Sequence, residues 1–200
     1  MRNIVIFLDP AHGSNVKGKC SPDNSHREYL WSRERVRNIK KVLESIGYEV
    51  FVTNDTDQEI GLTKRKNFAT NTCKKRHKLL LSLHNNAAGN EGKWMNARGV
   101  EVFTTIGYTK ADVCADYILR QFERDFPELK FRYNRNTLFD KDKEANFTVL
   151  SGSDYMGVLI EWLFQDNKED VAMLKDPVIN ERFECSIVSA IETIDNYFKE

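Results

Sequence analysis

The sequence predicts an α/β fold, a single domain built on a mostly parallel, twisted sheet of about six strands with helices on both faces. Three observations predict it. Short apolar runs rich in β-branched residues alternate with longer amphipathic stretches along all 200 residues. The 10 Gly and 4 Pro are scattered, and no linker, repeat or low-complexity segment divides the chain. An apolar fraction of 40% with 30% charged residues is typical of a globular domain.

The first half of the chain alternates expected strands with expected helices. Residues 3–9 hold five consecutive apolar residues and are closed by the turn-forming sequence Asp-Pro-Ala-His-Gly. Residues 25–46 carry an apolar stripe at helical spacing, and Gly47 ends that helix. The same patterns predict further strands at 48–53 and 78–83 and a helix at 61–76.

The second half continues the alternation. Residues 99–105 alternate as a strand, and residues 147–150 predict another, short one. Residues 157–161 form an apolar run that ends at Glu161, which predicts a buried strand. Two helices are expected, at 110–126 and at 177–198.

Composition excludes several classes of protein. Thirty Lys+Arg balance thirty Asp+Glu, which argues against a nucleic-acid binder. No apolar run approaches the roughly 18 residues of a membrane span. The N-terminal apolar run stops at Asp9, which does not fit a signal peptide, so we expect synthesis in the cytoplasm without one.

The four cysteines form no C-x-x-C pair, and Cys73 and Cys114 are expected to be buried thiols on helices.

Polar residues that suit metal-assisted hydrolysis follow three of the expected strands. His12 lies just after the first strand, His84 directly follows the strand at 78–83, and Glu161 ends the strand at 157–161. Because the carboxyl ends of parallel strands meet at one edge of a sheet, these side chains are expected to converge. Two histidines with a carboxylate form a common catalytic zinc shell. The alternatives are capping or core histidines, and an ion pair between Glu161 and Arg65.

The carboxylate ligand has several candidates. At about 100° per residue, Glu28 falls within about 40° of the centre of the apolar stripe of its helix, whereas Glu34 points to the opposite side. His26 lies well off the stripe, and Asp23 precedes the helix. Glu28 is therefore expected to face the sheet end where His12 emerges. The alternative is a capping box, Ser-x-x-Glu, in which Glu28 only caps its own helix.

At these residues the sequence resembles the zinc-dependent N-acetylmuramoyl-L-alanine amidases, the family of bacterial autolysins and phage endolysins that cut peptidoglycan. The likeness runs along the whole chain. The matching segments are Asp9-Pro10-Ala11-His12-Gly13, Glu28, Leu62 with Arg65, Leu81 to Ala87, Gly99 to Phe103, Val149-Leu150, and Val158 to Asn167. Two positions depart from the family pattern: Leu163 stands where the family often has Gly, and Gly157 where it often has Pro.

The resemblance implies a site and an activity. His12, Glu28 and His84 would bind one zinc ion, and Glu161 would be the catalytic glutamate. The bond implied is the amide between N-acetylmuramic acid and L-alanine. Zinc polarises a carbonyl and acidifies water, while a carboxylate beside that water moves its proton. Asn86 could orient His84 or the substrate, although an Asn that stabilises a turn is the alternative.

The remaining expectations concern substrate and role. Peptidoglycan, both glycan strand and stem peptide, is the expected partner, and the chain is expected to be a monomer with no nucleic-acid partner. Residues 1–200 are expected to form one catalytic domain without a separate wall-binding module. Loops at 88–98 and 132–146 could line the cleft through Trp94 and Arg135, with local packing as the alternative. Lack of a signal peptide favours an endolysin released through a holin.

Two other functions stay open at this point. One is a different zinc peptidase, a carboxypeptidase or aminopeptidase that uses the same shell on another amide. The other is a catalytically silent wall-binding domain. A divalent ion other than zinc could also occupy the site, since affinity orders alone do not fix occupancy.

Overall fold

The computed structural model describes residues 2–89, 92–134, 141–152 and 154–199. One six-stranded sheet runs through it in the order β2-β1-β3-β6-β4-β5. Strands β1, β2, β3 and β6 are parallel, β4 runs antiparallel to β6, and β5 is parallel to β4. The elements are β1 (Ile4–Pro10), α1 (Glu28–Ser45), β2 (Val50–Val52), α2 (Leu62–Asn71), β3 (His77–Asn86), β4 (Val100–Thr104), α3 (Lys110–Asp125), β5 (Lys143–Glu144), β6 (Met156–Phe164), α4 (Lys168–Leu174) and α5 (Pro177–Tyr197). The predicted fold class is confirmed.

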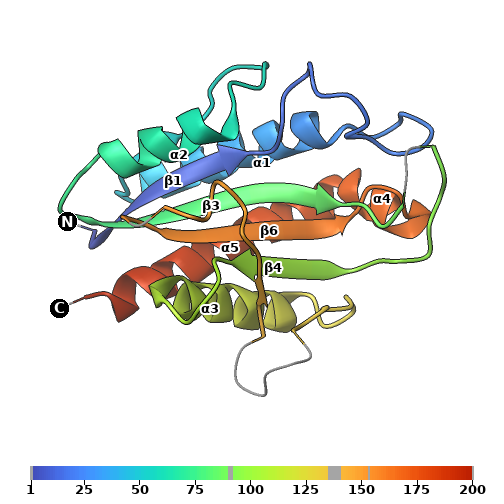
Figure 1. The fold of residues 1–200 in the computed structure, drawn as a ribbon. Coiled ribbons are helices and arrows are strands. Elements are labelled where there is room, and N and C mark those ends of the chain that lie inside the picture. The colour runs from blue at the N-terminus through green and yellow to red at the C-terminus, as the bar shows by residue number, and fades with distance from the viewer. Residues whose placement is uncertain (1, 90–91, 135–140, 153, 200) are drawn as a thin grey trace.

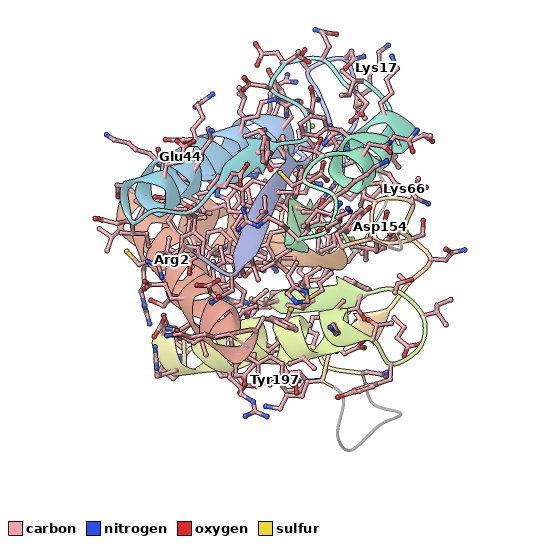
Figure 2. All side chains as sticks on the ribbon, turned by 90° about the vertical axis from the view of Figure 1, so that its left-hand side faces the viewer. Arg2, Lys17, Glu44, Lys66, Asp154 and Tyr197 are labelled. Carbon is pink, nitrogen blue, oxygen red and sulfur yellow. The ribbon has the colours of Figure 1, made fainter. Side chains whose placement is uncertain are left out.

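Helices cover both faces of the sheet because its central strands are apolar on both. Alternate residues of β1 point to opposite faces, so Ile4 and Ile6 pack in the large core with α1, α3 and α5. Val5 and Phe7 pack in a smaller core with Ala69 of α2. Figure 2 shows this layering, with Glu44 of α1 and Lys66 of α2 on opposite sides of the sheet.

Several boundaries differ from the predictions for local reasons. Helix α1 begins at Glu28, not at residue 25, and its N-cap Arg27 makes no side-chain cap bond. Helix α2 ends at Asn71. The buried ammonium of Lys78 caps this end of the helix by donating hydrogen bonds to the carbonyls of Ala69, Thr70 and Thr72. The prediction for Cys73 is therefore wrong: it lies outside the helix at φ 51° and is only partly buried, whereas Cys114 is buried in α3.

Three elements were predicted wrongly or not at all. Residues 147–150 form a turn closed by bonds from the Leu150 and Ser151 amides to the Phe147 carbonyl, not a strand. Val149 and Leu150 are buried because the turn packs on Leu159 of β6. The two elements that the sequence did not predict are the short strand β5, which forms the edge of the sheet, and α4, which begins at the side-chain cap of Asn167.

The topology brings one end of three strands together. The carboxyl ends of β1, β3 and β6 point in the same direction, away from the N-terminus (Figure 1). Register pairs Pro10 with Leu83 and His84 with Glu161, so that the expected site residues emerge side by side. Among the described residues, no helix has the length and apolar character needed to cross a membrane.

Candidate metal centre and active site

A cleft of about 610 Å³ opens at the carboxyl ends of β1, β3 and β6. His12, Glu28, His84 and Glu161 all line it. The apolar side chains of Leu62 and Phe147 stand on its walls and are 47% and 39% exposed. This is the edge at which open α/β sheets bind ligands.

Three of these side chains form a compact donor cluster. Oε1 of Glu28 lies 3.0 Å from Nδ1 of His84 and 3.3 Å from Nε2 of His12. One donor atom from each residue lies within 4.8 Å of the others. The two imidazole rings meet edge to face, with centroids 5.0 Å apart. The side chains of His12, Glu28 and His84 thus converge, as the sequence predicted.

Glu28 is buried and firmly held. It is the first residue of α1, and its Oε1 accepts a hydrogen bond from the Asn85 amide at 3.1 Å. Its Oε2 accepts one from Nε2 of Gln165 at 3.1 Å. Burial alone would raise the pKa of Glu28, but the bonds from His12 and His84 hold that pKa well below its usual value. Glu28 therefore presents a charged oxygen to both histidines.

The other carboxylate and histidine candidates lie elsewhere. Glu34 pairs with Arg35 at 3.0 Å and is largely exposed. Asp23 accepts bonds from Ser21 and from the Ser25 amide in the loop before α1. His26 is buried and its Nε2 contacts Oδ1 of Asn85 at 2.8 Å. The capping-box alternative for Glu28 is wrong, because α1 starts at Glu28 itself.

The cluster suits a divalent zinc ion. A tetrahedral zinc with bonds of about 2.1 Å separates its donors by roughly 3.4 Å, close to the spacings in the cluster. Two imidazole nitrogens and one carboxylate oxygen are the donors that zinc favours, whereas magnesium prefers oxygen alone. Three protein donors also leave one coordination position for water or substrate. The residues fit the group that the family resemblance implies.

Glu161 faces the cluster from β6. Its Cα is paired in register with that of His84 on the neighbouring strand. The Oε2 atom is inaccessible to solvent and accepts no hydrogen bond from the described residues. Burial, opposed by His84 and reinforced by Glu28 and Glu101, raises the pKa of the Glu161 carboxyl to about 7. A cleft carboxylate with one buried oxygen that has no hydrogen-bond partner among the described residues is a strong candidate for proton transfer.

Arg65 does not pair with Glu161, so that alternative is wrong. Its buried guanidinium bonds Asp9 at 2.9 Å and Glu59 at 2.7 Å. It also donates to the carbonyls of Pro10 and His12. His12 has a φ of 48°, an uncommon left-handed conformation for a non-glycine residue. Arg65 therefore fixes the backbone that presents the His12 ring.

We expect Arg65→Met to destabilise the protein by about 3–5 kcal/mol, since it leaves the buried Asp9 carboxylate without its cation. The measurement is the free energy of unfolding in urea. Lys64→Met is the matched control, because Lys64 is the exposed neighbour on the same helix. Equal stability of the two variants would contradict this role for Arg65.

The sequence reasoning missed three supporting residues. Gln165 and Asn85 hold Glu28, and Glu101 lies in register with Glu161 on β4. Glu101 accepts bonds from Arg132 at 2.6 Å, Lys143 at 2.8 Å and the side chain of Asn86 at 3.0 Å. The charged residue inside the apolar strand 100–104 was the available signal for Glu101, as it was for Glu161. Gln165 offered none, because it follows the end of its strand.

Other expected contacts turn out differently. Asn86 bonds Glu101 and the Ala87 amide, and it lines the cleft. Trp94 packs locally, with the Lys168 ammonium 5.7 Å from its ring centroid. Leu163 is buried at φ 62°, beside the register shift between β3 and β6, so the departure from Gly leaves a left-handed backbone in place. Arg135 lies outside the described residues.

A family model described as N-acetylmuramoyl-L-alanine amidase matches residues 6–193. The amidase AmiC of Neisseria meningitidis serogroup B is 26% identical over an alignment of 231 positions, which covers 98% of this chain and 53% of that protein. The amidase CwlM of Bacillus licheniformis is 29% identical over 176 residues, which cover 86% of this chain and 61% of that protein. The chain thus spans a little over half the length of these relatives.

The crystal structure of an N-acetylmuramoyl-L-alanine amidase from Clostridium difficile 630 has the same fold, with a TM-score of 0.82. The similarity covers 96% of this chain and 97% of that one at 22% sequence identity. At this level of identity the likeness concerns the fold.

Proposed function

The chain belongs to the N-acetylmuramoyl-L-alanine amidase family, and we propose that it hydrolyses the amide between N-acetylmuramic acid and L-alanine in peptidoglycan with one zinc ion held by His12, Glu28 and His84. The observation that carries the proposal is the juxtaposition of two groups in one cleft. A three-residue donor cluster faces Oε2 of Glu161, which is inaccessible to solvent and has no hydrogen-bond partner among the described residues.

The chemistry of an amide requires both groups. A bound zinc ion supplies Lewis acidity, which polarises a carbonyl oxygen and acidifies water. His12 would bind it through Nε2 and His84 through Nδ1, the atoms that face Glu28. Glu28 would supply the third donor, and its bonds to Asn85 and Gln165 would keep its oxygens in place.

Glu161 would carry the proton. Its carboxylate would take a proton from the attacking water and deliver it to the leaving nitrogen of L-alanine. A pKa of about 7 suits both halves of that task, because the carboxyl group can take up and release a proton near neutral pH. The exposed side chains of Leu62 and Phe147 would contact apolar parts of the substrate on either side.

The test is digestion of purified peptidoglycan, read by mass spectrometry. We expect zinc-loaded protein to release stem peptides that begin at L-alanine. Removal of zinc by a chelator should abolish release, and added zinc should restore it. Release of other termini with zinc bound would instead indicate a different peptidase, and binding to the wall without cleavage would indicate a silent wall-binding domain.

The broader role is also a proposal. We propose that residues 1–200 act as one catalytic domain without a separate wall-binding module among them. A role as a phage or prophage endolysin predicts a gene next to a holin in a lysis cassette. A gene outside any such cassette would favour cell-wall remodelling.

A further inference from the structure

A second cavity lies beside the catalytic cleft. It has a volume of about 880 Å³, and Phe103, Arg132 and Lys143 are among the residues that line it. Two contacts join it to the cleft. The ring of Phe103 meets that of Phe147, a cleft residue, at 5.4 Å between centroids. Asn86, another cleft residue, bonds Glu101, which in turn contacts Arg132 and Lys143 of the cavity. We call this second cavity the edge groove.

A row of paired residues leads from the metal cluster to the edge groove. His84 is in register with Glu161, and Glu161 with Glu101. Neighbouring strands lie about 4.8 Å apart, so Glu101 is roughly 10 Å from His84 across the sheet. Directly paired residues share one face of the sheet. Glu161 therefore lies between the metal cluster and Glu101 on this face of the sheet.

Two cations are fixed at that point. Arg132 and Lys143 both bond Oε1 of Glu101, and their side chains are 32% and 30% exposed. Arg132 uses Nε for this bond, and a guanidinium has five N–H donors in all. Rings hold both cations in position: Phe164 lies under the guanidinium at 5.4 Å, and Phe103 lies under the ammonium at 5.7 Å.

The charge of the edge groove suits an anionic ligand. Glu101 is buried, and although burial alone would raise its pKa, Lys143 and Arg132 hold that pKa below its usual value. One carboxylate therefore faces two cations, and Lys130 and Glu144 at the rim balance each other. The rings of Phe131 and Tyr133, which alternate with Arg132 along the chain, stack at 6.2 Å and pack against the large core, so that they anchor the segment that carries Arg132.

Resting on the proposed function, we propose that the edge groove binds the stem peptide through a carboxylate, held by Arg132 and Lys143. The stem peptide carries free carboxylates, whereas the glycan beyond the scissile bond offers none. An extended peptide advances about 3.4 Å per residue. The distance of roughly 10 Å from His84 therefore places the bound carboxylate about three residues beyond the scissile amide.

The experiment titrates the zinc-loaded protein with the free stem tetrapeptide beginning at L-alanine, followed by NMR. Because the tetrapeptide has no scissile amide, binding is read without catalysis. We expect Arg132→Gln and Lys143→Gln each to weaken binding about tenfold, which is about 1.4 kcal/mol. Lys143→Arg should restore most of the affinity. Arg120→Gln, which removes an exposed cation from α3, is the matched control and should bind normally.

A second arm needs no variant. The same tetrapeptide with its carboxylates amidated should bind the unchanged protein about tenfold more weakly. Equal affinity for both peptides, or unaltered binding by Arg132→Gln and Lys143→Gln, would overturn the proposal. The proposal would also be overturned if Arg132→Gln and Lys143→Gln weakened the binding of a glycan that carries no peptide. Peptide binding that depends on both cations, in a protein that cleaves no peptidoglycan, would support the edge groove and refute the proposed activity.

Discussion

Replacing Glu161 by Gln should lower kcat for release of stem peptides by roughly 10²–10⁴-fold, the usual contribution of general acid–base catalysis. The amide keeps the size of the side chain but can neither take a proton from water nor return one to the leaving nitrogen. Because Oε2 of Glu161 accepts no hydrogen bond from the described residues, the substitution breaks no bond described there. Stability should therefore change little. The measurement is the initial rate of peptide release from purified peptidoglycan.

Zinc binding separates the proposed role of Glu161 from another. We expect Glu161→Gln to keep the zinc affinity of the unchanged protein, because the donor cluster consists of His12, Glu28 and His84. Loss of zinc together with activity would make Glu161 a metal ligand. A variant that keeps more than a tenth of the rate would remove Glu161 from the proton transfer. Glu192→Gln is the control, since Glu192 is a partly exposed carboxylate beside Arg2, at the N-terminal end of β1.

The convergence of the four site residues was predictable because it depends on local patterns. Strand ends can be read from apolar runs, and parallel strands then bring His12, His84 and Glu161 to one edge. The phase of an amphipathic helix was enough to choose Glu28 over Glu34. What followed from pairing between distant segments was not predictable. Arg65 bonds Asp9 and Glu59 rather than Glu161 because of the way α2 packs on β1.

The same distinction explains the errors in the fold. Residues 147–150 have the apolar character of a strand, but Val149 and Leu150 are buried by packing on Leu159, which the sequence pattern does not reveal. The early end of α2 depends on Lys78, which reaches back from β3 to the helix carbonyls. The support of Glu28 by Gln165 depends on the irregular pairing after His84, where Leu163 takes a left-handed conformation.

The expected effect of Glu28→Gln is the loss of zinc rather than of proton transfer. Bound zinc should stabilise the unchanged protein by about 2.7 kcal/mol at a free concentration one hundred times Kd. In a domain of this size each kcal/mol raises Tm by about 2–4 °C, so a rise of about 5–10 °C is expected on adding zinc. An amide oxygen carries no charge, and the variant should show no rise.

Helix α1 provides the control for that measurement. Glu34→Gln changes the same residue type six positions further along the helix, where the side chain is exposed and pairs with Arg35. It should keep the full zinc-dependent rise in Tm and the full rate of peptide release. If Glu28→Gln also kept the rise, zinc would bind elsewhere and the donor cluster would have another purpose. If both variants lost it, the effect would come from α1 as a whole, and only the contrast between them assigns the metal to the Glu28 carboxylate.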